Sequence, residues 1–447
     1  MRSDLPKVAH LAAGRPLLDH VISCAATLIP ASVVVVVGHG ADNVRSILPD
    51  GVIDALQEEQ LGTGHAAQIG LDALGAVDPE DIIVVLYGDT PLLTPELLSR
   101  LTDLDDGESS RLISAHLDDP TGYGRVIRDS EGRVISIVEH RDCTAAQLEI
   151  DEVNAGIYAV RAGRLSHALK RVTNDNAQGE HYLTDVVGIL VAEGDRLSAV
   201  EGSSQEVMGI NSHDQLAEAR AELRRRINTE LMESGVEIID PAHTYIDDTV
   251  RVEPGARIYP GTYLEGSTVV GAGTRVGPDV FAVDSIIGEN ATVWYAVLRA
   301  SEVGDDCEVG PYASLRPGSV LKTGSKVGTF VETKNTTLGE GAKAPHQSYL
   351  GDATVGPRAN IGAGVITVNY DGVKKSKTDI GEDAFVGSDT MLVAPVRIGD
   401  RATTGAGSVI TKDVSDDALA VERSDQKEIP GYSRRREARK AAEDAED

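Results

Sequence analysis

A repeat of six residues runs through the second half of the chain, from about residue 246 to residue 410. One slot of each hexad is aliphatic in three separate runs, and glycine often follows it. Such a repeat predicts a parallel β-helix, in which three hexads form one triangular coil and the aliphatic side chains stack inside. Chance spacing in an ordinary β-rich domain is the alternative, and three runs with one period argue against it. The aliphatic slots are Val252, Ile258, Leu264, Val270, Val276, Val303, Val309, Leu315, Leu321, Val327, Ile380, Val386, Leu392, Ile398 and Ile410.

Length and composition limit the remaining possibilities. A chain of 447 residues has room for two or three domains. The net charge of −29 argues against a general nucleic-acid or anionic-membrane binder. Cys24, Cys143 and Cys307 show neither a disulfide framework nor metal-ligand spacing, and the longest apolar run, 33–37, is too short to span a bilayer. We therefore expect a cytoplasmic protein with no nucleic-acid partner and no membrane span.

The first half of the chain alternates strand and helix patterns. Residues 33–37 and 82–87 are continuous apolar runs, which are typical of strands buried on both faces of a parallel sheet. Residues 42–48 and 66–74 have the pattern of helices. This alternation predicts an α/β domain, in which ligands bind beyond the carboxyl ends of the strands.

Three features of this half could bind a phosphorylated ligand. Asp89 follows the second apolar run, where a carboxylate can hold Mg²⁺, although a single aspartate in a turn is more often a capping residue. Gly62, Thr63 and Gly64 precede a helix and would let backbone N–H groups approach a base or phosphate, as many ordinary loops also do. Lys7 could meet a phosphate or remain solvated.

Four short motifs follow in a fixed order. They are Thr-Gly-Tyr-Gly-Arg-Val at 121–126, Ile-Val-Glu-His at 137–140, Val-Asn-Ala-Gly-Ile-Tyr at 153–158 and Gly-Ile-Asn at 209–211. Together with the features above, they resemble the uridyltransferase half of the bifunctional N-acetylglucosamine-1-phosphate uridyltransferase / glucosamine-1-phosphate N-acetyltransferase family. The resemblance covers nearly the whole chain and implies a nucleotidyltransferase-like, Rossmann-like α/β domain.

The resemblance also implies a set of site residues in this half. Asp89 and Asn211 would bind Mg²⁺. A sugar phosphate oxygen would attack the α-phosphorus of UTP and pyrophosphate would leave, a reaction that needs positioning and cations more than a covalent nucleophile. The residues implied for the UDP-N-acetylglucosamine site are Lys7, Gln57, Gly62, Thr63, Gly124, Glu139, Asn154 and Asn211.

The start of the chain departs from the family pattern. The family opens with a strand and a Gly-rich turn, Leu-Ala-Ala-Gly-x-Gly-Thr-Arg-Met, just before its Leu-Pro-Lys segment, and Met1 stands here at the last position of that turn. The similar stretch from Leu11 follows Lys7 instead of preceding it. We therefore expect a protein that starts at Met1 to acetylate glucosamine 1-phosphate but to make little UDP-N-acetylglucosamine.

A helix is predicted between the two halves. Ser212 and Gln215 have the spacing of a capping box, and apolar residues recur after them at helical intervals as far as Leu231. The predicted organisation is a nucleotidyltransferase domain at 1–213, a helical linker at 214–234 and the β-helix at 235–447. Beyond about Val421 the chain is charged, and we expect a frayed tail with no assigned function.

The β-helix carries a second group of polar residues. Arg316 and Lys334 are eighteen residues apart, one full coil, so the two cations are expected to stack as a phosphate site or to remain two solvated charges. His346 suits the task of removing a proton from an amine, although a single histidine is more often structural. Residues 369–378 stretch the hexad spacing and predict a loop, whose lysines could meet coenzyme A phosphates or simply be solvated.

These residues resemble the acetyltransferase half of the same family. The resemblance implies a left-handed β-helix, acetyl-CoA as co-substrate, a homotrimer and His346 as the general base. Gln347 after His346 departs from the leucine that the family pattern has there. The implied glucosamine 1-phosphate site is Arg316, Lys334, Tyr349 and Asn360, and the implied acetyl-CoA site is Ala363, Asn369, Tyr370, Ser388, Ala406 and Arg423.

The sequence therefore favours a bifunctional enzyme that acetylates glucosamine 1-phosphate and then transfers uridylyl from UTP, supplying a cell-wall precursor. Three alternatives stay open at this point. They are an acetyltransferase with an inactive nucleotidyl domain, a nucleotidyltransferase for another sugar phosphate with a structural β-helix, and a non-enzymatic scaffold. His346, Tyr349 and the pair Asn369-Tyr370 argue against the second of these. The third gives no reason for Arg316, Lys334 and His346 to lie within one coil of each other.

Overall fold

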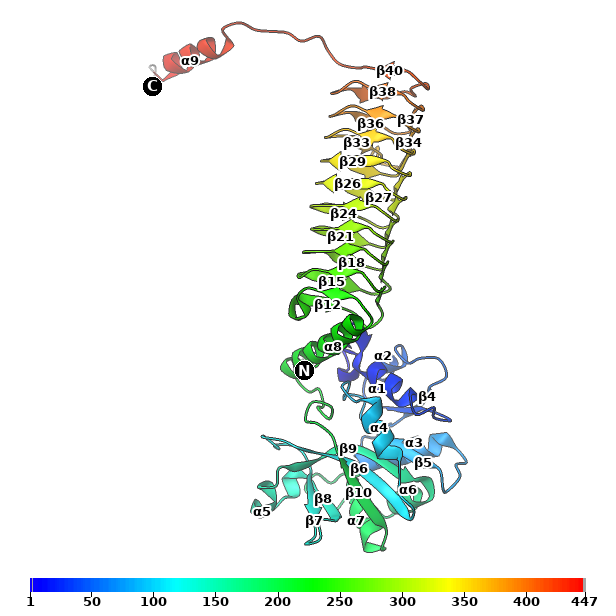
Figure 1. The fold of residues 1–447 in the computed structure, drawn as a ribbon. Coiled ribbons are helices and arrows are strands. Elements are labelled where there is room, and N and C mark those ends of the chain that lie inside the picture. Colours follow the sequence, from blue (N-terminus) through cyan, green and yellow to red (C-terminus); the bar gives the residue numbers. More distant parts are fainter. Residues whose placement is uncertain (2, 445–447) are drawn as a thin grey trace. The chain divides into compact units, whose positions relative to one another are not determined.

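The computed structural model describes residue 1 and residues 3–444, and the chain divides into two compact units (Figure 1). Unit 1 comprises Met1–Glu230 with Ile246–Thr249, and unit 2 comprises Leu231–Tyr245 with the chain from Val250 onward. Within the described residues, no helix combines the length and the apolar character that a membrane crossing requires.

Unit 1 is built on a mixed six-stranded sheet. Its strands follow the order β10-β6-β9-β7-β8, and β5 also pairs with β9. The strand β6 runs parallel to β10 and antiparallel to β9. The bounds are β5 Ile82–Val85, β6 Glu108–His116, β7 Arg125–Arg128, β8 Val134–Val138, β9 Glu152–Arg161 and β10 Arg196–Glu201.

Apolar clusters lie on both faces of the central strands. Leu112 of β6 packs in one cluster and its neighbour Ile113 packs in the other. On β9, Tyr158 packs in the cluster of Leu112 and Ile157 packs in the cluster of Ile113. Because successive side chains of a strand point to opposite faces, helices must cover both sides of this sheet. The helices that begin in unit 1, not all of which touch this sheet, are α1 Leu17–Ala26, α2 Ala41–Arg45, α3 Thr63–Leu74, α4 Pro95–Thr102, α5 Ala145–Leu148, α6 Ala162–Leu169, α7 Asp185–Ala192 and α8 His213–Glu233.

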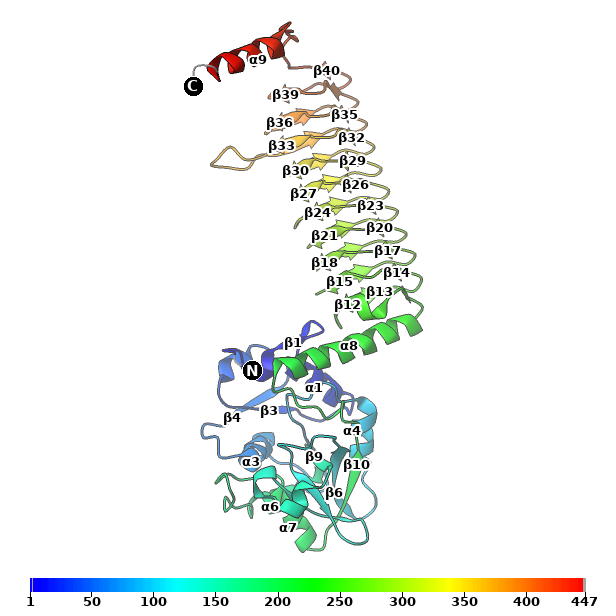
Figure 2. The same cartoon turned by 90° about the vertical axis from the view of Figure 1, so that its left-hand side faces the viewer.

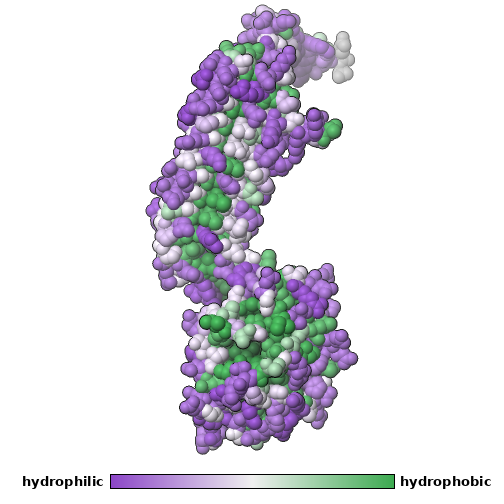
Figure 3. Space-filling view, turned by 90° about the vertical axis from the view of Figure 1, so that its right-hand side faces the viewer, coloured by the Kyte–Doolittle hydropathy of each residue, from purple (hydrophilic) through white to green (hydrophobic). Residues whose placement is uncertain are grey.

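The two strands predicted to be buried on both faces of a parallel sheet are arranged differently. The strand β3, Val34–Val37, forms a separate two-stranded parallel sheet with β4, Ile53–Leu56, and β5 is antiparallel to β9. The prediction was wrong here because an apolar run reveals neither the partner of a strand nor its direction. Three residues of β3 are only half-buried, and Ile82 is 37% exposed. Figure 3 shows hydrophobic side chains gathered on one face of unit 1.

Helix α8 begins with the predicted capping box. The Gln215 N–H donates to the Ser212 hydroxyl at 3.1 Å, and the Ser212 N–H donates to Oε1 of Gln215 at 3.0 Å. Farther along, Arg225 and Arg226 bind the Glu222 carboxylate and lower its pKa to about 2. Unit 1 includes most of this helix, as far as Glu230, and the predicted boundaries at 213 and 234 stay a prediction.

Unit 2 is a left-handed parallel β-helix of hexapeptide repeats with three faces, as predicted (Figures 1 and 2). The first face contains β11 Glu237–Ile238, β14 Arg257–Ile258, β17 Arg275–Val276, β20 Thr292–Val293, β23 Glu308–Val309, β26 Lys326–Thr329, β29 Lys343–His346, β32 Asn360–Ile361, β35 Phe385–Val386, β38 Thr403–Thr404 and β40 Leu419–Ala420.

The two other faces follow the same pattern of short parallel strands. The second face contains β12 Thr244–Ile246, β15 Thr262–Glu265, β18 Phe281–Val283, β21 Ala296–Arg299, β24 Ala313–Leu315, β27 Glu332–Lys334, β30 Tyr349–Gly351, β33 Ile366–Val368, β36 Met391–Val393 and β39 Val409–Ile410. The third face contains β13 Arg251–Val252, β16 Val269–Val270, β19 Ile286–Ile287, β22 Glu302–Val303, β25 Val320–Leu321, β28 Thr337–Leu338, β31 Ala353–Val355, β34 Thr378–Ile380 and β37 Val396–Ile398.

Coil length explains where the hexad register of the sequence breaks. Val276 pairs with Val293, 17 residues on, and Val293 pairs with Val309, 16 residues on. The aliphatic side chains still stack and stay buried, because a shorter corner absorbs the missing residues. The stack therefore tolerates changes at its corners better than changes to its inward-facing side chains.

One coil is much longer than the others and carries the predicted loop. Val355 pairs with Ile380, 25 residues on, and the extra residues follow β33. Figure 2 shows this loop projecting from the stack beside β33. Val373 in it is 91% exposed. The prediction of a loop standing off the coil is confirmed.

The charged end of the chain forms a helix, α9 Tyr432–Glu443, instead of the predicted frayed tail. It contains no buried residue, and Arg439 donates to Glu443 one turn later at 2.8 Å. Arginine, glutamate and alanine all favour helix, so local propensity forms this element without tertiary packing.

The inward stack gives a prediction for stability. Leu315 lies between Leu298 and Thr333 of the adjacent coils, and all three are fully buried. Leu315→Ala should lower the free energy of unfolding of unit 2 by about 2–5 kcal/mol, because a cavity replaces the side chain. Hydrogen exchange should rise mainly in the neighbouring coils, since each coil contacts only its neighbours.

Denaturant unfolding with hydrogen-exchange mass spectrometry makes this measurement. Val373→Ala is the matched control, because that side chain is exposed and its loss should change stability by less than about 0.5 kcal/mol. Equal stabilities for the Leu315 variant and the parent chain would refute the role of the inward stack.

Candidate functional site

Three predicted residues of unit 1 meet beyond the end of β5. The Lys7 ammonium forms an ion pair with the Asp89 carboxylate and donates to Oδ1 of Asn211 at 2.9 Å. The backbone fixes this arrangement, because the Ile210 N–H donates to the Asp89 carbonyl at 2.9 Å. Oxygen atoms of Asp89 and Asn211, which are far apart in the sequence, thus hold the Lys7 ammonium between them.

A second group of predicted residues lines a cavity of about 260 Å³. The Gln57 amide donates to the Gly62 carbonyl at 3.2 Å, and Thr63 Oγ1 accepts from the Leu183 N–H at 3.0 Å. Gly62 has φ +111°, and a β-carbon there would lie 2.5 Å from the His181 carbonyl oxygen. Only glycine fits this turn, which begins α3. The lining residues are Gln57, Gln60, Gly62, Thr63, Ala66 and Glu180.

A third group lies on β9 and next to it. Burial raises the pKa of Glu139, although the Thr184 hydroxyl opposes this by donating to its carboxylate at 3.0 Å. Buried Asn154 donates to the Tyr158 hydroxyl at 2.7 Å, which fixes the orientation of its amide. The Asn154 N–H donates to the Gly124 carbonyl at 2.9 Å, so these two predicted residues lie side by side.

Tyr87 connects the three groups and was missed in the sequence. Its hydroxyl bonds to Thr63, and burial, with the nearby charges of Glu139 and Asp89, raises its pKa to about 12. Its ring occupies the space beside Gly156, where any β-carbon would overlap it. The sequence feature that could have pointed to Tyr87 is its position as a tyrosine at the end of an apolar run, two residues before Asp89. Thr184 and Tyr158 gave no comparable signal.

In unit 2 the predicted cations stack. Leu315 pairs with Thr333, so Arg316 and Lys334, each one residue later, lie on adjacent coils. The Arg316 guanidinium donates to Glu332 at 2.8 Å. Lys375 of the projecting loop lies against Lys334 and, together with Arg316, lowers the pKa of the Lys334 ammonium.

Lys375 was predicted only as a possible contact of coenzyme A. Three cations so close repel one another unless an anion joins them. The Asp352 carboxylate, whose oxygens accept from Asn335 and Asn369 at 2.7 and 2.5 Å, offsets this repulsion only in part, since the pKa of Lys334 is still lowered. The cluster is therefore suited to a phosphate.

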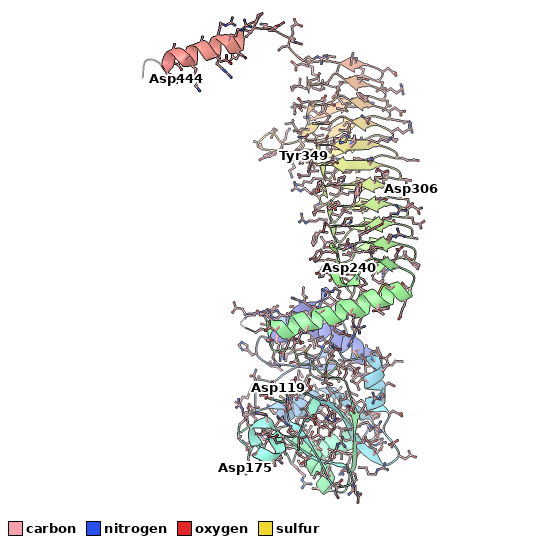
Figure 4. All side chains as sticks on the ribbon, turned by 60° about the vertical axis from the view of Figure 1, so that its left-hand side comes forward. Asp119, Asp175, Asp240, Asp306, Tyr349 and Asp444 are labelled. Atoms are coloured by element: carbon pink, nitrogen blue, oxygen red, sulfur yellow. The ribbon has the colours of Figure 1, made fainter. Side chains whose placement is uncertain are left out.

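Tyr349 and the buried Asn369 lie on the next two coils. A β-carbon at Gly351 would overlap the Tyr349 hydroxyl and lie 2.8 Å from Nδ2 of Asn369, so both polar groups face the space above this glycine. Tyr349 begins β30 and Asn369 follows β33, the next strand along the second face. Figure 4 labels Tyr349 among the side chains of the stack.

His346 is exposed at the corner between the first and second faces. The next residue, Gln347, has φ +41°, and its N–H donates to the Thr329 carbonyl at 2.8 Å. The glutamine that departs from the family pattern thus forms the turn itself. Its carbonyl accepts from the Gly364 N–H at 2.9 Å, which connects His346 to the coil that contains Asn360 and Ala363.

The residues predicted for acetyl-CoA fall into two groups. The Ala363 carbonyl accepts from Asp389 at 2.7 Å, the Ser388 carbonyl accepts from Gly407 at 2.9 Å, and Arg423 donates to the Ala406 carbonyl at 3.0 Å. Ala363, Ser388 and Ala406 therefore stack at the corner before the second face. Asn369 and Tyr370 instead follow β33, at the opposite end of that face. Within one chain, these two groups of predicted acetyl-CoA residues therefore do not meet.

Comparison with known proteins supports both units. Residues 1–162 match the MobA-like NTP transferase domain, and residues 377–412 match the bacterial transferase hexapeptide family of six repeats. The first match covers the predicted uridyltransferase motifs as far as β9, and the second covers the last coils of the β-helix.

Whole-chain relatives give the same result. A bifunctional protein GlmU of Streptomyces coelicolor is 48% identical over 100% of this chain and 94% of its own length. Proteins of the same name from Caldanaerobacter subterraneus and Bordetella bronchiseptica are 45% and 46% identical, each over 97% of this chain. These matches give no support to an acetyltransferase alone, to a nucleotidyltransferase for another sugar phosphate or to a scaffold. The chain belongs to the family of bifunctional GlmU proteins, and the resemblance seen in the sequence is confirmed.

Proposed function

We propose that this chain makes UDP-N-acetylglucosamine in two steps, one on each unit. The expectation of little uridylyl transfer is not kept, because relatives matched over 100% of this chain are named bifunctional. It is an acetyltransferase and a uridyltransferase, and its product supplies cell-wall synthesis. The observation that carries the proposal is that both predicted groups of residues assemble, one at the strand ends of unit 1 and one on the β-helix. The proposed functional domains are 1–213 and 235–447, with 214–234 as the connecting helix.

In the first reaction, the amine of glucosamine 1-phosphate attacks the thioester carbon of acetyl-CoA. A C–N bond forms, the C–S bond breaks, and coenzyme A leaves as the thiol. Because an amine is mostly protonated near neutral pH, a base must take its proton before the attack. We assign this role to His346, whose imidazole is exposed at the corner between two faces.

The cationic cluster of unit 2 would hold the sugar phosphate. Arg316 can bind a phosphate with two parallel hydrogen bonds, while Lys334 and Lys375 act as point charges. A dianion there would relieve the repulsion that lowers the pKa of Lys334. We assign Tyr349 and Asn360 to the same sugar, since Tyr349 begins the neighbouring strand and Asn360 lies one coil from His346.

In the second reaction, a phosphate oxygen of N-acetylglucosamine 1-phosphate attacks the α-phosphorus of UTP, and pyrophosphate leaves. The cavity lined by Gln57, Gly62 and Thr63 would bind part of the nucleotide sugar. Gly124, Glu139 and Asn154 would hold the remainder, since buried polar groups that are already oriented cost little to arrange on binding. Lys7 would contact a phosphate.

The residues at the strand ends fit Mg²⁺. Within the described part of the chain, no cluster of three histidine, cysteine or acidic side chains forms a complete metal cage. Mg²⁺ needs none, because it is commonly held by one carboxylate together with substrate phosphates and waters. The oxygens of Asp89 and Asn211 already share the Lys7 ammonium, so this donor set is suited to a cation. When bound, Mg²⁺ would neutralise the charge that develops on the phosphates.

We further propose a homotrimer in which acetyl-CoA binds between neighbouring copies. The two groups of acetyl-CoA residues lie at opposite ends of the second face, so a second copy would bring Ala363, Ser388, Ala406 and Arg423 to the loop of its neighbour. The second face also has an open hollow of about 600 Å³ lined by aromatic side chains. Tyr312 there is 57% exposed, and covering such apolar surface favours association.

A cytoplasmic location is proposed from the chemistry of the cysteines and substrates. Cys24, Cys143 and Cys307 are all unpaired, as is usual in a reducing compartment. UTP and acetyl-CoA are made inside cells. Fractionation of cells that express the chain tests this location.

His346→Ala should reduce acetyl transfer by about 10²–10⁴-fold and leave the fold and uridylyl transfer unchanged, because only the general base is lost. Thiol release from acetyl-CoA in the presence of glucosamine 1-phosphate measures the first rate, and pyrophosphate release from UTP measures the second. The control is His243→Ala, which removes an exposed histidine paired only with Asp240. Acetyl transfer within a few-fold of the parent rate would rule out His346 as the base.

Light scattering at micromolar concentration should give three times the chain mass of 47.2 kDa. Tyr312→Lys should shift the mass toward one chain, because it places a charge on the aromatic hollow. Tyr432→Lys, at an equally exposed residue of α9, should leave the mass unchanged. A single-chain mass for the parent protein would disprove the trimer.

A further inference from the structure

A buried guanidinium shapes the turn before β7. Arg125 is 1% exposed, although arginine is rarely buried without a specific partner. Its Nη1 donates to the carbonyls of Pro120 and Tyr123 at 2.8 and 2.5 Å. The Tyr123 N–H also donates to the Pro120 carbonyl at 3.2 Å, which closes the turn. One cation thus holds both ends of the segment that precedes Gly124.

The turn extends a tyrosine side chain toward the metal ligands. The Tyr123 ring packs against the cluster that contains Ile157 and Val207, and a hydrogen bond joins its hydroxyl to the Gly209 backbone. Burial raises the pKa of this hydroxyl, against the opposing hydrogen bond. The bond therefore joins the 120–124 turn to the segment that ends in Asn211.

Gly209 is in direct contact with the proposed metal ligands. A β-carbon there would lie 3.6 Å from Oδ2 of Asp89 and 3.9 Å from Nδ2 of Asn211. The Asn211 amide donates to the Gly209 carbonyl at 3.4 Å. A shift of Gly209 would consequently move Asn211 relative to Asp89.

We propose that Tyr123, held by buried Arg125, is a positioning residue that sets the affinity of unit 1 for its divalent cation by fixing Gly209 beside Asp89 and Asn211. The proposal rests on the uridylyl transfer proposed above. It explains why a charged side chain is buried at a turn that makes no chemical contact with the metal. The same turn presents Gly124, so metal and sugar sites share one support.

Tyr123→Phe tests this inference because it removes only the hydroxyl and keeps the packed ring. Losing one hydrogen bond should weaken divalent-cation binding about 3–10-fold. Binding is measured with Mn²⁺ as the probe, by the loss of its free paramagnetic resonance signal in the presence of UDP-N-acetylglucosamine. The Mg²⁺ concentration that gives half-maximal uridylyl transfer should rise by the same factor, with little change in kcat at saturating Mg²⁺. Acetyl transfer by the same protein should not change.

Two further variants separate positioning from general destabilisation. Tyr182→Phe removes a hydroxyl that accepts from Gln178 at 2.9 Å, and it should leave Mn²⁺ binding unchanged. Arg125→Lys keeps the charge but removes the guanidinium whose Nη1 donates to both carbonyls. If Arg125 acts through Tyr123, the double variant should bind Mn²⁺ no more weakly than Tyr123→Phe alone.

The outcomes distinguish this inference from the proposed function. A parent chain that neither transfers uridylyl nor binds Mn²⁺ would overturn both. A parent chain that does both, together with a Tyr123→Phe variant of unchanged Mn²⁺ affinity, would overturn the positioning role alone.

Discussion

The stacking of aliphatic side chains inside the β-helix is the constraint on which the geometry of unit 2 depends. Each inward residue packs on its equivalent one coil away, as Leu298, Leu315 and Thr333 do. Because this register fixes the backbone, outward residues at equivalent positions are also brought together. Arg316 and Lys334 are neighbours for this reason alone, and Lys375 reaches them only because one coil is long enough to include a loop. The same scaffold places His346 at a corner, where its imidazole is open to solvent.

The site residues of unit 1 are positioned in a different way. No repeat aligns its polar residues, so buried contacts between distant segments do so instead. Thr184 holds Glu139, Tyr158 holds Asn154, and the backbone of Ile210 holds the Asp89 segment. The glycines at 62 and 156 leave space for a carbonyl and for the Tyr87 ring. A site built this way depends on many residues that never touch the substrate, and Arg125 is the clearest of them.

The sequence predicted unit 2 better than unit 1, for a physical reason. A hexad period predicts both where the strands lie and which strands pair. The fold, the cation stack and the projecting loop could therefore all be predicted. In unit 1, the apolar run at 33–37 revealed a strand but not that it pairs with β4 alone in a separate sheet. Tyr87 and Thr184 were missed because their roles arise from tertiary contacts. The charge of the last residues predicts fraying, but arginine, glutamate and alanine favour helix, and α9 forms.

The central claim is that two separate groups of residues perform two reactions in one chain. Mixing two purified variants, His346→Ala and Asp89→Asn, tests it most directly with glucosamine 1-phosphate, acetyl-CoA and UTP supplied together. Each variant alone should make little UDP-N-acetylglucosamine, because one lacks the base and the other lacks the carboxylate proposed for Mg²⁺. The mixture should make it readily, since free N-acetylglucosamine 1-phosphate passes from one protein to the other. A mixture as inactive as its components, or full synthesis by either variant alone, would contradict this account.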